Sequence, residues 1–424
     1  MEPKEFINIP TYKRKSSYLD HQFNNITDIN KVFFNNKCYF FKVIEKYFPE
    51  EGQKFISVFE HLKTLANNIT ELFPEGKIRL LKTGENSQIN LTRKQVALLF
   101  LLSFLGLLYV EDKKNMNLFE VSNLLYKKSD TAVEFGRSFL NYLTVIGKWI
   151  SENNEHLNEQ IIYLRRNINS KDYLEKQENI KLCELKVDTK ESLFNGTASY
   201  CVDFANKYIG GGVLTGGCVQ EEILFCIEPE AIVSLYFMEV MNENDAIGIY
   251  DTIQYSDYKG YGSMFSYNGC LIDENSPIKK HRIIAIDASV LEKSFFYSKE
   301  KQLIDNINRD LHKAYVGFSL VNFDKNLEKT IATGNWGCGV FGGNHELKFI
   351  QQWIAASFAG VERLDYYTFG DKKTKLVEKL NKDIKEKFKT ADNLYNALKI
   401  VSTLDENYIK NLLNLELDFD SDMK

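Results

Sequence analysis

The sequence of 424 residues lacks several features that would place it in a common class. Lysine and arginine form no dominant block in a chain of net charge −5, which argues against non-specific nucleic-acid binding. No CxxC pair occurs among the seven cysteines, so we expect reduced thiols and neither a disulfide framework nor a zinc site. The six histidines show no HxxxH or similar spacing, so no metal is expected.

Long apolar runs and a recognisable secretory leader are missing as well. The longest apolar run is Val96–Val110, which is shorter than the ~20 residues that cross a bilayer. We therefore expect a buried helix there, with a short membrane-inserting segment as the less favoured alternative. The first residues, "MEPKEFINIP", are charged and lack the apolar core of a secretory signal. Apolar content of 44% with 26% charged residues is typical of a folded globular protein.

The composition predicts two regions. Residues 1–178 are expected to form a mainly helical accessory region, because apolar residues recur there at three- to four-residue intervals, as in 49–73. From 179 to 424, short apolar runs typical of strands alternate with helical stretches and end in C-terminal helices. This alternation indicates an α/β fold with helices on both faces of a sheet.

A glycine-rich loop follows the first of the apolar runs. Five glycines fall within residues 210–217, between the apolar run 200–209 and a predicted helix. Glycine lets a backbone approach a ligand that a Cβ would hold away. No GK[ST] follows, which excludes a Walker loop, and the dinucleotide fingerprint GxGxxG with a later acidic residue is not matched.

A second glycine loop occupies residues 333–344. It follows a predicted strand and leads into a predicted helix that starts near His345. Small residues ahead of a helix N-terminus suit a diphosphate. A tight turn is the alternative for either loop alone, whereas two such loops in the α/β region favour a phosphate-bearing ligand.

Two adjacent glutamates, Glu221 and Glu222, follow the first loop. Adjacent glutamates are most often a solvated helix start, where the helix dipole favours them. Here Ile223, Leu224 and Phe225 follow at once, and apolar surroundings beside a like charge favour a protonated carboxyl. A protonated carboxyl is what a general acid supplies in glycosidic cleavage.

A glycine-containing segment, 254–267, gathers aromatic residues. Core packing is the default for each of them, but a cluster in a loop suits stacking on a purine. The residues are Tyr255, Tyr258, Tyr261, Phe265 and Tyr267.

Together these motifs resemble the poly(ADP-ribose) glycohydrolase family. GGG at 210–212, a short spacer and QEE at 220–222 are similar to the family signature, and "VDFAN" at 202–206 resembles the strand before that loop. "GNWGCGVFGG" at 334–343 resembles the family's diphosphate loop. The segments "YSDYKGY" and "YYTFGD" resemble its adenine-side segments, and "RIIAIDA" resembles a further strand. The matching stretches run from about 182 to 371 in the family's order, and "TRKQVALLFLLSFLGLL" is similar, less specifically, to its accessory region.

The resemblance implies a fold and an activity. The fold is a macrodomain-like mixed sheet flanked by helices, with the N-terminal mainly helical accessory region packed against it. The activity is hydrolysis of ribose–ribose O-glycosidic bonds in poly(ADP-ribose), with release of ADP-ribose. Two neighbouring side chains on one strand-to-helix turn do not flank a sugar, which disfavours an inverting pair separated by ~6.5–9.5 Å. One carboxyl that acts first as acid and then as base is the preferred interpretation.

The resemblance also assigns roles around the first loop. Glu222 would be the acid/base through an oxocarbenium-like transition state, and Glu221 would bind ribose hydroxyls. Gln220 would order the pair, while Asp203 and Asn206 would position the ribose and the loop. The backbone of Gly211 and Gly212 is expected to bind substrate.

Around the second loop, Phe341 would press on the diphosphate and distal ribose. Gly339 and Val340 would offer backbone N–H groups. Tyr261 would stack on adenine, with Phe369 packing nearby and Tyr258 as a further neighbour.

One position departs from the family pattern. The family carries an acidic residue on the adenine side about ten positions before its counterpart of Asp203. Leu193 stands there in this chain, and Glu191 is a nearby carboxylate that would take the role if the loop shifts.

Three alternatives remain at this stage: a macrodomain that binds ADP-ribose without cleaving it, a dinucleotide-dependent oxidoreductase, and an interaction scaffold built on the N-terminal helices. The expected partners are poly(ADP-ribose), ADP-ribose and ADP-ribosylated proteins, with no cofactor, no direct nucleic acid and no membrane. We expect a monomer in the nucleus and/or cytoplasm, acting in the DNA damage response and carbohydrate metabolism. Cleavage within chains or from their ends stays open, and the resemblance suggests that the protein-linked ADP-ribose is not removed.

Overall fold

The structure, a computed structural model, describes residues 5–9, 16–108, 115–176, 178–273, 277–290, 300–370, 375–401 and 407–415. It divides into two compact units, each assembled from separate stretches of the chain. Unit 1 comprises residues 1–165, 205–241 and 249–282; unit 2 comprises residues 166–204, 242–248 and 283–424. The division after residue 178 that composition indicates stays a prediction.

The strands form one eight-stranded sheet, in the order β3-β4-β7-β10-β6-β11-β12-β5, and two two-stranded sheets. The strands of the large sheet are β3 (Ser87–Thr92), β4 (Gln160–Asn167), β5 (Glu184–Asp188), β6 (Tyr200–Ala205), β7 (Asp245–Ile253), β10 (Lys280–Asp287), β11 (Thr330–Gly334) and β12 (Arg363–Tyr367). The small sheets pair β1 (Phe6–Asn8) with β2 (Lys77–Arg79), and β8 (Ser256–Lys259) with β9 (Ser266–Cys270). The large sheet is mixed, because β3 and β4 are antiparallel whereas β6, β11, β12 and β5 are parallel.

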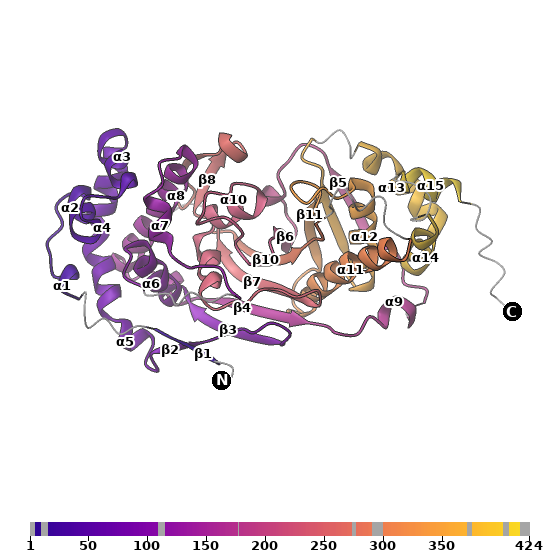
Figure 1. Cartoon of the computed structure of the whole chain (residues 1–424), viewed down its shortest axis with the longest axis horizontal. Helices are drawn as coiled ribbons and strands as arrows, with labels where there is room; N and C mark the ends of the chain where they lie inside the picture. Colours follow the sequence, from indigo (N-terminus) through magenta and orange to yellow (C-terminus); the bar gives the residue numbers. More distant parts are fainter. Residues whose placement is uncertain are drawn as a thin grey trace. The chain divides into compact units, whose positions relative to one another are not determined.

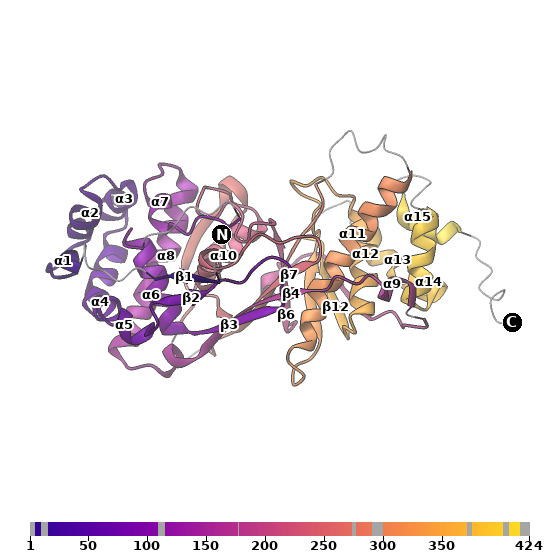
Figure 2. The same cartoon turned by 60° about the horizontal axis from the view of Figure 1, so that its bottom comes forward.

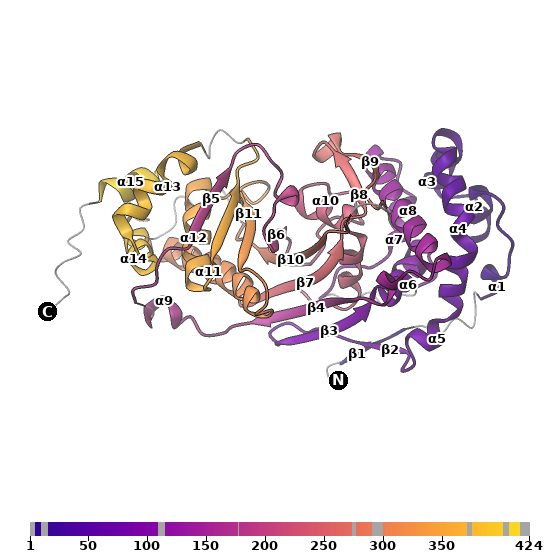
Figure 3. The ribbon, with the colours of Figure 1, turned by 180° about the vertical axis from the view of Figure 1, so that it is seen from behind.

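Unit 1 is mainly helical. Its helices are α1 (Ser16–Leu19), α2 (Ile26–Phe34), α3 (Tyr39–Tyr47), α4 (Pro49–Asn67), α5 (Ile69–Leu72), α6 (Arg93–Phe104), α7 (Val121–Leu125), α8 (Asp130–Ser151) and α10 (Gln220–Ile227), with the 3-10 turns η1 (Glu155–Asn158), η3 (Pro229–Tyr236) and η4 (Gly262–Met264). Helices α4, α6 and α8 pack together, and the β8–β9 hairpin lies beside α8 (Figures 1 and 3). The apolar stripe predicted for 49–73 is the buried face of α4.

The predicted buried helix at Val96–Val110 is present in part as α6, which ends at Phe104; Tyr109 and Val110 lie outside the described residues. A Thr92 side chain caps its N-terminus by accepting a hydrogen bond from Gln95 N, so the helix begins at Arg93. Every side chain from Val96 to Phe104 is buried. In the part of the chain that the structure describes, no helix combines the length and apolarity needed to cross a membrane.

Helix α10 and the turn η3 after it are anchored to the N-terminal helices of unit 1. The buried Arg93 Nε donates to Glu230 Oε1 at 2.7 Å, and its Nη1 donates to Glu159 at 2.8 Å. Ser138 Oγ on α8 donates to the Cys226 carbonyl at 2.8 Å, inside α10 itself. Burial raises the pKa of Glu230, and Arg93 opposes that rise by favouring the charged form.

Unit 2 stacks helices against parallel strands. Its helices are α9 (Tyr173–Lys176), α11 (Glu300–Phe318), α12 (His345–Phe358), α13 (Lys375–Phe388), α14 (Ala391–Val401) and α15 (Tyr408–Asn414), with the 3-10 turns η2 (Leu193–Asn195) and η6 (Ser319–Asn322). Helices α11 and α12 pack side by side, and α13, α14 and α15 form a group next to them (Figure 2). Gly317 allows α11 to approach β10, because a Cβ there would lie 2.4 Å from Ile286 Cγ2.

The parallel register places several loops at one edge of the sheet. Ile331 of β11 is opposite Tyr200 of β6, and Gly334 is opposite Tyr367 of β12. The chain therefore leaves β6, β11 and β12 at the same edge, where ligands of open α/β sheets bind. The two predicted glycine loops follow β6 and β11.

One expectation for the N-terminal region needs correction. The region 1–178 is mainly helical, as predicted, but it also supplies β3 and β4 to the large sheet. The segment Pro229–Tyr236 is a 3-10 helix, and its buried Glu230 carboxylate accepts a hydrogen bond from Ile253 N of β7.

A chain that begins at residue 180 is expected to fail to fold. It would keep α10 and η3 but would lose α6 and α8, leaving Glu230 as an unpaired buried charge and a large apolar face uncovered. We expect this shortened chain in the insoluble fraction and the full chain in the soluble fraction. A soluble product with a cooperative thermal unfolding transition would show that the N-terminal helices are dispensable.

Candidate active site

The first glycine loop lies in unit 1, where it leads from the end of β6 to the start of α10. It turns back on itself through Thr215 N and Gly217 N, which donate to the Gly212 carbonyl at 2.8 and 2.9 Å. Gly210 and Gly211 have φ of 82° and 48°, a backbone conformation that side chains other than glycine rarely adopt. The predicted glycine loop is thus a compact turn that ends where α10 begins at Gln220.

The two adjacent glutamates point back into this loop. Glu221 Oε2 accepts from Asn206 N at 2.8 Å and its Oε1 accepts from Gly210 N at 2.7 Å. Glu222 accepts from Gly212 N and Val219 N, each at 2.8 Å. The residues are only 3% and 6% exposed, so they do not form a solvated helix start. Backbone N–H groups thus supply hydrogen bonds to all four oxygens of two buried carboxylates.

The glycines leave no room for side chains against these carboxylates. A Cβ on Gly211 would lie 2.5 Å from Glu221 Oε2 and 2.6 Å from Glu222 Oε1, and a Cβ on Gly217 would lie 2.8 Å from Glu222 Oε1. Since both oxygens lie this close to one point, no more than about 5 Å separates them. An inverting pair needs roughly 6.5–9.5 Å, so the two carboxyls do not form one.

Aromatic residues of the β8–β9 hairpin lie near the same helix start. Burial raises the pKa of the Tyr261 hydroxyl, the negative charge of Glu222 adds to the rise, and a hydrogen bond with the Gln220 backbone opposes it. Tyr261 is 45% exposed, so part of its side chain is in contact with solvent. Tyr258 stacks on Phe265 with ring centroids 5.8 Å apart, and its ring therefore packs within the hairpin.

Asn206 and Asp203 flank the start of the loop. Asn206 Oδ1 accepts from Tyr208 N at 3.0 Å, so its side chain shapes the first turn of the loop. Asp203 belongs to β6 in unit 2 and is fully buried, which fits a positioning role rather than an open binding surface.

The second glycine loop lies in unit 2 between β11 and α12. Trp336 is buried and its Nε1 donates to the Ile286 carbonyl at 2.9 Å, which fixes the loop's first residues. Gly339 has open space where a Cβ would be, and Val340 is 82% exposed. Phe341 is partly buried. Asn344 caps α12 by accepting from Leu347 N at 3.0 Å, so the loop ends at a helix N-terminus as predicted.

Phe369 follows β12 at the same sheet edge of unit 2. Asn335 Nδ2 in the second loop donates to the Thr368 carbonyl at 3.1 Å, which ties the two segments together. Phe369 has a φ of 53° and is 64% exposed, an uncommon combination for a large apolar residue. Unit 1 thus brings together Asn206, Gly211, Gly212, Gln220, Glu221, Glu222 and Tyr261, and unit 2 holds Asp203, Gly339, Val340, Phe341 and Phe369.

One positioning residue of the first loop escaped sequence reasoning. Asn117 Nδ2 donates to the carbonyls of Gly211 and Ile209 at 2.9 and 3.0 Å. An isolated asparagine between two helices carries no pattern, so nothing in the sequence marked it. In the ranges that the structure describes, no group of three His, Cys, Asp or Glu side chains is placed to hold a metal ion.

Comparison with known proteins identifies the family of this chain. Residues 172–376 match "Poly (ADP-ribose) glycohydrolase (PARG), Macro domain fold", and residues 46–166 match the helical domain of the same family. The chain belongs to the poly(ADP-ribose) glycohydrolase family. The predicted family, the macrodomain-like fold and the assignment to a family of enzymes are thereby confirmed.

Named relatives of this family align with much of the chain. Poly(ADP-ribose) glycohydrolase 1 of Arabidopsis thaliana is 28% identical over 406 residues, covering 78% of this chain and 73% of that protein. Poly(ADP-ribose) glycohydrolase 1 of Caenorhabditis elegans is 37% identical over 200 residues, covering 43% of this chain and 25% of that protein. The solved structure of the poly(ADP-ribose) glycohydrolase of Deinococcus radiodurans in complex with ADP-ribose aligns at a TM-score of 0.32 and 14% identity, covering 52% of this chain and 94% of that one.

Substitution Gly211→Ala is expected to displace both glutamates. The added Cβ would collide with an oxygen of each carboxylate, and a positive φ costs an alanine roughly 1–2 kcal/mol in addition. We expect loss of hydrolysis in a protein that still folds, measured by polymer breakdown and thermal unfolding. Gly76→Ala is the matched control, since Gly76 has a φ of 60° with open space around it. Equal activity of both variants would contradict the geometry.

Cys218 is expected to resist alkylation although it lies in the first glycine loop. Burial raises the pKa of its thiol to about 12, and the Glu222 charge contributes, so the reactive thiolate is scarce near pH 8. Treatment with iodoacetamide followed by peptide mass spectrometry should label the exposed Cys270 first. Labelling of Cys218 at the rate of Cys270 would show that this burial is wrong.

Proposed function

We propose that this chain hydrolyses the ribose–ribose O-glycosidic bonds of poly(ADP-ribose) and releases ADP-ribose, with Glu222 as general acid and base. The relatives that it matches are named poly(ADP-ribose) glycohydrolases, and the solved relative is described as bound to ADP-ribose. The observation that carries the proposal is the pair of buried carboxylates that backbone N–H groups hold in the first glycine loop.

The proposed reaction uses one carboxyl twice. Glu222 gives its proton to the ribose oxygen that leaves, while positive charge develops at the anomeric carbon in an oxocarbenium-like transition state. Water then attacks that carbon and returns a proton to Glu222, which restores the acid. No second carboxylate is needed on the opposite face, in keeping with the short separation of Glu221 and Glu222.

Glu221 is proposed to bind ribose hydroxyls rather than to transfer protons. Its oxygens hold Asn206 N and Gly210 N, so it fixes both ends of the loop's first turn. Gln220 is proposed to order the pair, and Asn206 and Asp203 to place the ribose.

The nucleotide part of the substrate is proposed to use backbone and aromatic groups. Gly211 and Gly212, and separately Gly339 and Val340, would face the substrate with peptide groups, and Phe341 would press on the diphosphate. Tyr261 and Phe369 have exposed rings suited to adenine, with Tyr258 supporting the hairpin.

Partners and placement follow from this activity as further proposals. The partners would be the polymer, ADP-ribose and ADP-ribosylated proteins. The monomeric state, the nuclear and/or cytoplasmic location, and the link to the DNA damage response and carbohydrate metabolism stay predictions.

The variant Glu222→Gln tests the proposal. It should lower kcat by roughly 10²–10⁴-fold because the leaving oxygen loses its proton donor. Binding of ADP-ribose, measured by calorimetry, should persist, which separates an enzyme from a pure ADP-ribose reader. Glu221→Gln is the matched control, because it also places an amide among backbone donors but should act mainly on substrate affinity. Hydrolysis of labelled polymer by Glu222→Gln at the wild-type rate would remove Glu222 from the mechanism.

A further inference from the structure

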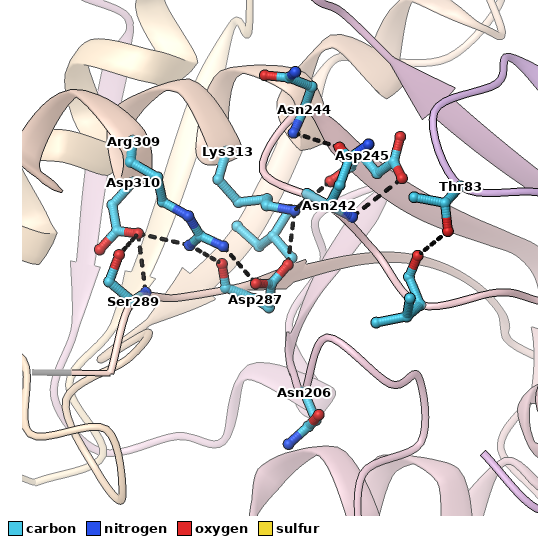
Figure 4. A network of polar contacts seen from close by, with 12 residues as sticks. Thr83, Asn206, Asn242, Asn244, Asp245, Asp287, Ser289, Arg309, Asp310 and Lys313 are labelled. Carbon is cyan, nitrogen blue, oxygen red and sulfur yellow. Dashed lines mark hydrogen bonds and ion pairs between the residues drawn. The ribbon is translucent and has the colours of Figure 1, made fainter. Parts of the chain in front are cut away.

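A buried cluster of charged side chains in unit 2 takes no part in the roles assigned so far. Arg309 Nη2 donates to Asp287 at 2.5 Å and its Nη1 donates to Asp310 at 2.8 Å. Lys313 Nζ forms an ion pair with Asp287 at 2.7 Å, and Lys348 Nζ donates to Asp310. Figure 4 shows how Arg309, Asp287 and Lys313 converge. All but Arg309 are buried, and Arg309 is partly so.

These charges persist inside the protein because they neutralise one another. Burial alone would raise the pKa of Asp310, but Lys348 and Arg309 outweigh it and hold that pKa below its ordinary value. Asp310 is the member with most partners, since Ser289 N and Ser289 Oγ also donate to it at 3.0 and 2.9 Å. It therefore joins α11, α12 and the segment after β10.

Lys348 lies directly beneath the second glycine loop. It stands in the first turn of α12, and its Cε would be 3.3 Å from a Cβ on Gly337 and 3.0 Å from a Cβ on Gly343. Its Nζ lies 4.8 Å from the centroid of the Trp336 ring. The lysine stem thus packs against the underside of the loop near both of its ends.

Ala288 completes this support, because a Cβ on Gly337 would lie 2.6 Å from Ala288 Cβ. We call Ala288 and Lys348 the loop floor. Asp310 holds Lys348 through its ammonium and holds Ala288 through the adjacent Ser289. One carboxylate therefore fixes both parts of the loop floor, while Gly339 and Val340 face open space on the other side.

We propose that Lys348 and Asp310 are positioning residues of the second glycine loop, and that the loop floor they fix sets how tightly the loop holds the diphosphate of an ADP-ribose unit. This inference rests on the proposed function. Neither side chain touches substrate. Their effect is on the curvature of the backbone whose N–H groups are proposed to meet phosphate oxygens, so it belongs to binding rather than to proton transfer.

Two double variants distinguish an effect on the second glycine loop from a general loss of protein stability. Loss of one partner alone would leave an unpaired buried charge, which threatens folding. Lys348→Met/Asp310→Asn and Lys348→Ala/Asp310→Asn both remove one charge of each sign, and they differ only in whether a stem remains under the loop. Each is compared with the full-length wild type for thermal unfolding, calorimetric Kd of ADP-ribose, and KM and kcat on polymer.

The methionine pair should keep the Kd of ADP-ribose within roughly threefold of the wild type, because its stem still fills the space under Gly337. The alanine pair should weaken that Kd by roughly tenfold or more and raise KM alike, with kcat within about threefold, the pattern of lost binding. Glu51→Gln/Arg137→Met removes one charge of each sign from a partly buried ion-pair group in unit 1 and should leave Kd and KM unchanged.

The inference would be overturned if the folded variant Lys348→Ala/Asp310→Asn had the Kd and KM of the wild type. It would also be overturned if that variant lowered kcat alone. If the alanine pair does not fold, Lys348→Arg keeps the charge but puts a wider head under the loop, and an unchanged KM in that variant would overturn it equally. A wild type that binds ADP-ribose without cleaving polymer would reject the proposed function, while the Kd comparison would still decide this inference. A wild type that does not bind ADP-ribose would overturn both.

Discussion

The burial of two carboxyl groups side by side is the constraint on which the site depends. Glu221 and Glu222 are almost excluded from water, and each must have its oxygens satisfied to remain there. The chain satisfies them with four backbone N–H groups, from Asn206, Gly210, Gly212 and Val219. A backbone can approach two carboxylates this closely only if it has no side chains in the way, which explains why five glycines precede the pair. The glycines and the glutamates therefore depend on each other, because the glycines permit the close backbone approach that the buried glutamates require.

The second glycine loop is stabilised in a different way from the first. It contains no carboxylate around which to fold, and Gly339 and Val340 are exposed on it, so contacts with other parts of unit 2 fix its shape. Trp336 anchors one end through Ile286, while Lys348 fills the space below Gly337 and Gly343. A lysine can occupy this place because Asp310 neutralises it, and Asp310 is in turn kept charged by Arg309. Hydrogen bonds to Glu221 and Glu222 hold the first loop in shape. Trp336 and Lys348, which pack against the second loop, hold that loop in shape.

The sequence was informative where chemistry and local pattern coincide. Glycines followed by paired glutamates, the buried helix α6 and the strand–loop–helix order around both loops could all be predicted, because each depends on neighbours along the chain. The strands β3 and β4 were missed, since they lie among helices in a region where a helical period dominates. Long-range contacts were missed for a different reason. Asn117 reaches the first loop across more than 90 residues, and Lys348 meets Asp310 across 38, and neither separation leaves a periodic signal.

The N-terminal helices support the helix that carries Glu221 and Glu222. Helix α10 carries Glu221 and Glu222 in its first turn and is only eight residues long, too short to hold a fixed orientation by its own hydrogen bonds. Its last turn is tied to α8 through Ser138, and the turn that follows it is tied to α6 through Arg93 and Glu230. A shift of α8 or α6 would therefore move the carboxylates relative to the glycine loop, and hydrogen bonds of 2.7 to 2.8 Å tolerate little displacement. The helices α6 and α8 thus help to fix the orientation of α10, and with it the positions of Glu221 and Glu222 against the first glycine loop.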